Sequence, residues 1–318
     1  MNSMTRRTLL MSAATVGVGT VAACTRSQPS NSGEATARSG RFGVGTYNTQ
    51  EVADELRYIE ENIRPRPRTD AKRVLITGST GGIGQLAAAY LLARGHSVVA
   101  HARNEQRAAD VRRDLPAVED VVIGDLLNLD QTRALATQIN ELPRFDVIIH
   151  NAGEYGIANS QILNANSLSP YLLTSLVNSP ADALVYLTSD LHLGGDLELD
   201  ELRGDGAHIT YDDSKLHMAT LAIAVARRRP DIRVNAVAPG WVPTKMGFHN
   251  GPYAPDDLRA GYMTQVWLAE GTEAARQITG NFLFHQKPET QVHPAVHDPR
   301  AQDDLLAAYA QRTGVSLT

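Results

Sequence analysis

Short apolar runs alternate with segments of helical spacing over most of the chain, from about residue 72 onward. The runs lack polar alternation, which is typical of strands buried on both faces of a sheet. They lie at 74–76, 98–100, 121–123, 147–149, 184–187, 234–237 and 281–284. Helical spacing occupies 83–94, 129–141, 164–177 and 211–228. Since strands that alternate with helices form parallel sheets, the pattern predicts one doubly wound α/β domain over 71–318 with a mainly parallel seven-stranded sheet.

The chain before residue 71 has a different character. Residues 25–45 are rich in Ser, Gly and Thr and lack apolar periodicity, and 49–62 place apolar residues at helical intervals. Residues 64–68 alternate arginine with proline, which favours an extended connector. We therefore expect 25–70 to be a flexible tether that contains a short helix and an Arg/Pro linker.

The first 24 residues have the order of a targeting sequence. Arg6 and Arg7 precede an acid-free, modestly apolar stretch from Thr8 to Ala23, which is too weakly apolar for a membrane span. The stretch ends at Val21-Ala-Ala-Cys24. This order resembles a twin-arginine signal followed by a lipoprotein cleavage site. It implies export and a lipid anchor on Cys24, at the outer face of the cytoplasmic membrane or in the periplasm. The alternatives are a disordered N-terminus with a chance cysteine and an uncleaved, cytoplasmic protein.

Composition excludes several classes of protein. The net charge of −5 gives no basic footprint for nucleic acid. Cys24 is the single cysteine of the 318 residues, so neither an intrachain disulfide nor a thiolate zinc site can form. His293 and His297 are separated by Pro294, and the acidic residues of 196–201 lack a calcium-loop pattern. We therefore predict no metal site.

A glycine-rich turn joins the first predicted strand to the first helix of the domain. Its sequence from Thr77 to Gly84 is TGSTGGIG. Glycines at such a turn let the backbone bend tightly and approach a pyrophosphate, which the helix N-terminus attracts. The strand-turn-helix context predicts a dinucleotide site on a Rossmann-type domain, whereas a glycine-rich turn alone would be weak evidence.

Tyr211 is the one tyrosine in the chain with a lysine four residues later, Lys215. Positions i and i+4 share a face of a helix, so the two side chains project together. A phenol ordinarily titrates near pH 10, and a neighbouring ammonium favours the phenolate and lowers that pKa. The pair therefore predicts a general acid or base that acts on an alcohol or carbonyl.

These motifs resemble, in order, those of the short-chain dehydrogenase/reductase family over about 72–285. The matching segments are 77–84, 151–153, 165–174, 184–189, 211–215 and 233–244. His150 departs from the family pattern, which has Asn there more often. The resemblance implies an oxidoreductase that transfers a hydride between a nicotinamide cofactor and an alcohol or carbonyl substrate.

The resemblance also implies the roles of four side chains. Tyr211 would be the catalytic acid or base, and Lys215 would in addition hold the nicotinamide ribose. Ser189 would hydrogen-bond the substrate oxygen, and Asn166 would hold a water that relays protons through Lys215. The further positions implied to contact the cofactor are Gly78, Ser79, Gly82, Ile83, Gly84, Asn151, Ala152, Gly153, Pro239, Gly240, Val242 and Thr244.

The end of the second strand bears on the choice between NAD and NADP. NAD-preferring relatives place an acid near Ala102 to bind the ribose 2′-hydroxyl, but here Arg103 and Asn104 follow an alanine. An arginine can bind the 2′-phosphate of NADP. We therefore expect NADP, with NAD as the less favoured cofactor. Arg103 as a solvated residue at a helix start is the alternative. Asp125 and Leu126 match the family's contact to the adenine.

Ser189 precedes Tyr211 by 22 residues, and the intervening run resembles that of the retinol-dehydrogenase-like branch. The substrate itself would be set by segments after Asn151, between Ser189 and Tyr211, and over 245–262. The family forms homodimers or homotetramers, a choice that the sequence leaves open. A cofactor-sensing or scaffold protein without catalysis is the alternative function.

Overall fold

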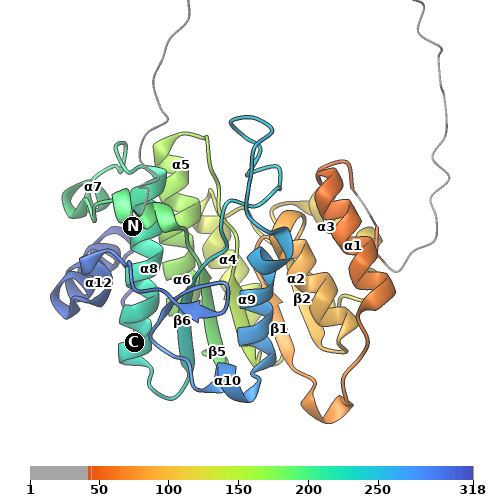
Figure 1. Ribbon diagram of the computed structural model, residues 1–318. Helices are drawn as coiled ribbons and strands as arrows, with labels where there is room; N and C mark the ends of the chain where they lie inside the picture. The colour runs from red at the N-terminus through yellow and green to blue at the C-terminus, as the bar shows by residue number, and fades with distance from the viewer. Residues whose placement is uncertain (1–41, 44, 318) are drawn as a thin grey trace, which may run out of the picture. The chain divides into compact units, whose positions relative to one another are not determined.

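The computed structural model describes residues 42, 43 and 45–317 (Figure 1). The predicted signal, Cys24 and the tether up to residue 41 lie outside these residues. The described residues belong to one compact unit. None of their helices is both long and apolar enough to cross a membrane.

The core of this unit is a twisted sheet whose strands run in the order β3-β2-β1-β4-β5-β6-β7-β8. Its strands are β1 Arg73–Ile76, β2 Ser97–Ala102, β3 Asp120–Ile123, β4 Val147–His150, β5 Ala183–Leu187, β6 Arg233–Ala238, β7 Phe282–Phe284 and β8 Lys287–Pro288. All adjacent pairs are parallel except β7–β8. The doubly wound α/β prediction is confirmed. The seven predicted strands are present. The antiparallel β8 was not predicted, because its residues Lys287 and Pro288 give no apolar pattern.

Two helical layers enclose the sheet, because alternate strand residues point to opposite faces. Leu75, Ile148 and Leu184 face one layer, whereas Val74, Ile76 and Val147 face the other. The first layer is built mainly from α4 Leu129–Asn140, α6 Ser169–Leu176, α8 Tyr211–Arg228 and α12 Pro299–Thr313 (Figure 1). The second layer contains α1 Gln50–Asn62, α2 Gly82–Ala93 and α9 Leu258–Glu270. The helix α3 Glu105–Asp114 covers the outer strands β2 and β3.

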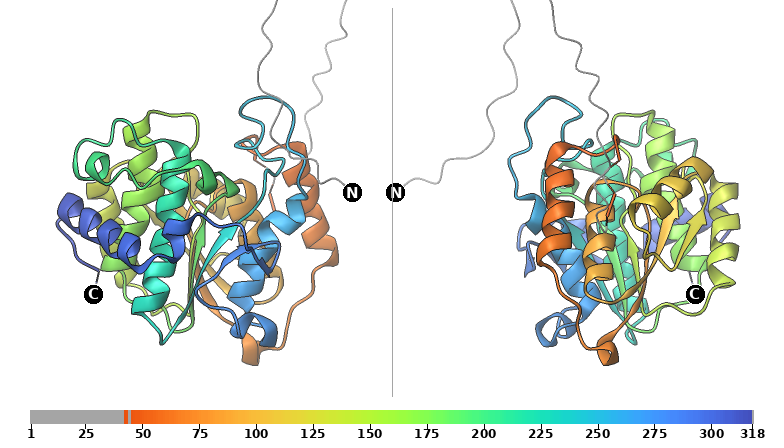
Figure 2. Two further views of the ribbon diagram at one scale, coloured as in Figure 1. Left: turned by 60° about the vertical axis from the view of Figure 1, so that its left-hand side comes forward. Right: turned by 90° about the vertical axis from the view of Figure 1, so that its right-hand side faces the viewer.

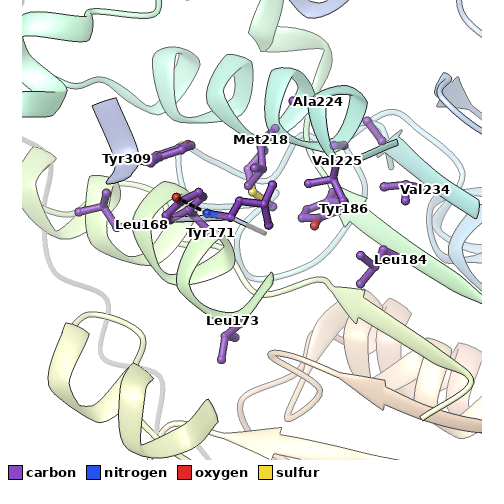
Figure 3. Packing of buried hydrophobic residues seen from close by; sticks show 14 of the residues in the cluster. Leu168, Tyr171, Leu173, Leu184, Tyr186, Met218, Ala224, Val225, Val234 and Tyr309 are labelled. Atoms are coloured by element: carbon purple, nitrogen blue, oxygen red, sulfur yellow. Dashed lines mark hydrogen bonds between the residues drawn. The ribbon is translucent and has the colours of Figure 1, made fainter. Parts of the chain in front are cut away.

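Shorter helical segments fill the connections. They are η1 Arg68–Asp70, α5 Asn159–Leu163, η2 Asn164–Leu168, η3 Asp190–Gly194, α7 Leu199–Arg203, α10 Glu273–Arg276 and α11 Pro294–His297. Figure 3 shows how the first layer is packed: Tyr171 of α6 stacks on Tyr309 of α12 at 4.6 Å between ring centroids, next to Met218 of α8. All three side chains are fully buried.

The helix predicted at 49–62 exists as α1, but it is part of the domain and not of a tether. Its apolar residues Val52, Leu56 and Ile59 are fully buried in the core shared with α2 and α9 (Figure 2). Glu55 accepts two hydrogen bonds from Arg259, both at 2.8 Å, and one from the Tyr262 hydroxyl at 2.6 Å. The prediction of a tether up to residue 70 is therefore wrong for α1. An amphipathic pattern reveals a helix but not the surface that its apolar face covers.

The packing of α1 predicts a stability effect that a tether would not have. Ile59→Val removes one methylene from a fully buried site, so we expect it to lower the free energy of unfolding by about 0.5–1.5 kcal/mol. Ile63→Val, at the partly exposed end of the same helix, is the matched control. Denaturant unfolding measures both. Equal stabilities for Ile59→Val and the wild type would contradict this packing.

Candidate active site

The predicted site residues meet at the carboxyl ends of the central strands. From β1 the chain passes to β2 and β3 on one side of it, and then crosses to β4 on its other side. The order of the strands therefore reverses between β1 and β4. Ligands of doubly wound sheets bind in the crevice at such a switch point. The loops that follow β1, β4, β5 and β6 carry the predicted motifs, and α8 carries Tyr211 and Lys215.

The glycine-rich loop lies against the segment after β4. This close contact requires glycine on the side of the loop. Gly78 has φ +66°, and a Cβ there would lie 2.8 Å from the Cα of Ala152. A Cβ at Gly84 would lie 2.4 Å from Nδ2 of Asn151. Thr77 fixes this contact, since its Oγ1 accepts hydrogen bonds from the backbone N–H groups of Asn151 and Ala152, both at 3.0 Å. The close approach explains the glycines and fits a loop that lies close to a pyrophosphate.

Side chains from the protein interior also hold this loop. The fully buried Ser79 donates its hydroxyl to Ile76 O at 3.0 Å and accepts the backbone N–H of His101. Ile83 packs partly buried against the core. His101 in turn accepts the N–H of Gly78 at 3.0 Å through Nδ1. Burial lowers the pKa of His101, which favours the neutral ring that this contact needs. No motif of the sequence indicates this role of His101.

Tyr211 and Lys215 share one face of the first turns of α8, as predicted. The helix begins with a capping box in which Thr210 and Asp213 bond each other's backbone. The Lys215 ammonium lies 5.3 Å from the centroid of the Tyr211 ring. Lys215 is buried, and among the described residues its Nζ makes one hydrogen bond, to Leu187 O at 3.3 Å. An ammonium has three donors, so this geometry leaves donors for a ligand such as a ribose.

Asn166 lies in a π-helical turn, η2, at the junction of α5 and α6. Single π turns inside helices often mark functional sites. The side chain bonds both backbone groups of Glu154, accepting from its N–H at 2.7 Å and donating to its C=O at 2.9 Å. A Cβ on Gly153 would lie 3.2 Å from Lys215 Nζ and 3.5 Å from Asn166 Oδ1. Gly153 thus keeps open the space that these two side chains face.

Ser189 lies two residues after the end of β5 and caps the short helix η3. Its hydroxyl donates to Asp190 Oδ1 at 3.0 Å and accepts the N–H of Leu191 at 3.2 Å. A substrate oxygen would therefore have to replace Asp190 as the acceptor of the Ser189 hydroxyl. Asp190 was not predicted as a site residue, since its role depends on the conformation of η3.

The electrostatics of Tyr211 differ from the expectation. Burial raises the pKa of Tyr211 well above its ordinary value, with smaller contributions in the same direction from Asp212, Asp190 and Tyr155. Burial also lowers the pKa of Lys215 to about 8. The prediction that the pKa of Tyr211 lies below its ordinary value is therefore wrong for this structure, because desolvation of the phenolate is the largest effect.

Arg103 and Asn104 follow β2 on the outer side of the glycine-rich loop. Asn104 caps α3 by accepting the N–H of Arg107 at 2.9 Å. Arg103 is 60% exposed and pairs with Glu154 at 3.9 Å. An exposed pair at this distance is worth little, so an anionic ligand could replace Glu154. Burial raises the pKa of Glu154 despite the opposing effect of Arg103.

The remaining predicted cofactor residues follow β3 and β6, at the same end of the sheet. Asp125 Oδ1 accepts the N–H of Leu127 at 3.0 Å, and Leu126 is buried. After β6, Pro239 leads into Gly240, whose φ is +85°. Val242 is buried, and Thr244 lies 3.6 Å from the position of a Cβ on Gly82. The loop after β6 therefore adjoins the glycine-rich loop.

An aromatic group adjoins Tyr211 and was not predicted. Tyr155 lies edge-on to the Tyr211 ring at 4.9 Å between centroids, and His249 lies edge-on to Tyr155 at 5.2 Å. Leu191, Leu193, Trp241, Met246 and Tyr253 are the exposed large apolar side chains of the segments after β5 and β6. Leu191, Leu193, Met246 and Tyr253 lie in two of the three segments that the sequence indicated as substrate-determining, whereas Trp241 lies just before the third.

The fold, the glycine-rich loop and the helix N-terminus behind it define a dinucleotide-binding domain of the Rossmann type. Residues 72–178 match the family model for short chain dehydrogenases. An uncharacterized oxidoreductase of Emericella nidulans is 41% identical over 256 residues, which cover 77% of this chain and 98% of the relative. The chain belongs to the short-chain dehydrogenase/reductase family of oxidoreductases.

Two further similarities bear on the branch and the fold. Human retinol dehydrogenase 14 is 30% identical over 285 residues, which cover 74% of this chain and 83% of the relative. A short chain dehydrogenase of Escherichia coli, solved as a complex with NADPH, superposes with a TM-score of 0.54 at 24% identity, covering 70% of this chain and all of that chain. The second similarity shows the fold alone.

Proposed function

We propose that this protein is an NADP-dependent oxidoreductase that interconverts a carbonyl compound and its alcohol, with Tyr211 as the acid or base. The observation that carries the proposal is the Tyr211–Lys215 pair on one face of α8, with the buried Lys215 ammonium 5.3 Å from the centroid of the Tyr211 ring. The most direct test is NADPH consumption with a panel of aldehydes and ketones. Binding of NADPH without turnover of any of them would favour a cofactor sensor or scaffold instead.

In the proposed reaction, the bound nicotinamide supplies the hydride to the carbonyl carbon. Tyr211 donates its phenolic proton to the carbonyl oxygen as the C=O bond becomes the C–O bond of an alcohol. The raised pKa of Tyr211 keeps the phenol protonated at neutral pH, which suits the reducing direction. Lys215 stabilises the tyrosinate that remains, and the Ser189 hydroxyl orients the substrate oxygen.

The cofactor preference rests on Arg103, which lies after β2 where NAD-preferring relatives carry an acid. Its exposed guanidinium can form charge-assisted hydrogen bonds to a 2′-phosphate. We propose a bulky, apolar carbonyl substrate, because Tyr155 lies edge-on to the Tyr211 ring and the loops after β5 and β6 expose the apolar side chains of Leu191 and Trp241.

The pKa of Lys215 predicts the pH dependence of the reduction. With a pKa of about 8, the stabilising ammonium is present below pH 8 and is lost as the pH rises through that value. The value of kcat/KM for reduction, which reports the free enzyme, should be level near pH 6–7 and should fall toward about tenfold per pH unit above 8. Lys215→Arg keeps its charge and should lose this alkaline limb. A wild-type kcat/KM that rises from pH 7 to 9 would contradict the assignment.

We further propose that the chain is exported and anchored through Cys24. Its support is the order of Arg6-Arg7, an apolar stretch and Val-Ala-Ala-Cys24. Mass spectrometry of protein from the membrane fraction should then find a mature N-terminus at Cys24 that carries acyl chains. NADP is made in the cytoplasm, so an exported enzyme would need to recycle its cofactor in place. An intact N-terminus in the cytoplasmic fraction would overturn the proposal and leave the catalytic assignment unaffected.

A further inference from the structure

The residues just before α1 lie against the two loops that form the candidate cofactor site. Thr49 donates its hydroxyl to Pro243 O at 2.8 Å, and the Lys245 ammonium donates to Thr46 O at 2.9 Å. Asn48 bonds the start of α2. Residues 46–49, which we call the clasp, therefore join the loop after β6 to the glycine-rich loop. The clasp precedes the segment that matches the family model, which begins at residue 72.

Asn48 supplies a cap that α2 cannot provide for itself. The N-cap residue of α2 is Gly81, which has no side chain to accept an N–H group of the first turn. Asn48 Oδ1 accepts the N–H of Gly82 at 3.1 Å. Its Nδ2 donates to Oε1 of the buried Gln85, one turn further along α2, at 2.7 Å. Both ends of the carboxamide are thus fixed to the helix that carries the phosphate-binding N-terminus.

The other residues of the clasp hold Asn48 in place. The Arg107 guanidinium stacks on the Tyr47 ring at 3.5 Å from its centroid and donates to Thr80 O of the glycine-rich loop at 2.6 Å. Tyr47 also bonds Asp114 at the far end of α3. A Cβ on Gly81 would meet Asn48 Oδ1 at 3.2 Å and the Tyr47 ring at 3.4 Å. The glycine-rich loop is therefore covered on its outer side by the clasp.

We propose that the clasp preorganises the cofactor site and that Asn48 is its positioning residue. The inference rests on the proposed function, because the ligand of the glycine-rich loop is a dinucleotide pyrophosphate. Such a loop binds with backbone N–H groups, so its affinity depends on how well their directions are fixed beforehand. Asn48 fixes Gly82, and Thr49 with Lys245 fixes the facing loop that contains Thr244. Asn48 is not a catalytic residue.

The test compares two ligands that differ in the pyrophosphate. Asn48→Ala should weaken NADPH binding, measured by nucleotide fluorescence, by about 5–10-fold. It should leave the affinity for 2′-AMP, which has no pyrophosphate, within about twofold. Asn48→Asp retains an acceptor for Gly82 but adds a negative charge near the pyrophosphate, so it should weaken NADPH binding at least tenfold. The control is Asn62→Ala at the other end of α1, where the exposed Asn62 side chain donates to Tyr58 O of the preceding turn.

Each outcome has a distinct meaning. Unchanged NADPH affinity in both Asn48 variants would overturn the inference and leave the proposed function in place. Tighter NADPH binding by Asn48→Ala would overturn it too, because Asn48 would then compete with the pyrophosphate for Gly82. Equal losses for NADPH and 2′-AMP would assign Asn48 to general stability instead. A wild-type protein that binds neither NADPH nor NADH would refute the proposed function and, with it, this inference.

Discussion

Tyr211→Phe should reduce kcat for carbonyl reduction by roughly 10²–10⁴-fold, the usual worth of general acid catalysis. Phenylalanine keeps the ring that packs against Tyr155 and removes only the hydroxyl that protonates the substrate oxygen. The affinity for NADPH should remain nearly unchanged.

Steady-state kinetics and a nucleotide titration measure the two halves of this prediction. Tyr58→Phe is a matched control, since Tyr58 lies on the surface of α1 against Arg259 and takes no part in the site. It should retain the wild-type rate. A Tyr211→Phe protein with near-wild-type turnover would sink the assignment of Tyr211 as the acid.

Arg103→Ala should weaken NADPH binding by about 1.5–3 kcal/mol, the scale of a hydrogen bond between charged groups. NADH lacks the 2′-phosphate, so its affinity should hardly change. The weak, exposed pair of Arg103 with Glu154 means that the substitution should cost little stability. The enzyme would then lose its preference for NADP and not its ability to bind a nicotinamide cofactor.

Arg112→Ala, an exposed arginine of the last turn of α3, controls for the general loss of positive charge. Isothermal titration of the wild type and of each variant with both cofactors gives the four affinities that each comparison needs. Equal losses for NADPH and NADH on Arg103→Ala would show that Arg103 does not read the 2′-phosphate.

The sheet and its main helices could be predicted because apolar periodicity reports burial directly. Strands such as Val147–His150, buried on both faces, leave an uninterrupted apolar run. β8 has no such run, since Lys287 and Pro288 are exposed. The helix α1 was visible in the pattern, but its place against α2 and α9 depends on long-range packing that periodicity does not encode.

The same distinction applies to the candidate site. Motif order identified Tyr211 and Lys215, which the fold places together on one helix face. The pKa of Tyr211 depends on burial, and the sequence offered only the neighbouring charge. Asn48 and Asp190 lie outside the motifs because their roles come from the tertiary contacts of a preceding segment and a short helix.

Hydride transfer in this site can be followed directly with an isotope label. NADPH that carries two deuterium atoms at C4 of the nicotinamide is incubated with the protein and a ketone substrate, and the alcohol is analysed by mass spectrometry. We expect one deuterium on the former carbonyl carbon, with this transfer strongly reduced in Tyr211→Phe. Wild-type protein that binds the labelled cofactor but transfers no deuterium to any carbonyl compound of the panel would contradict it.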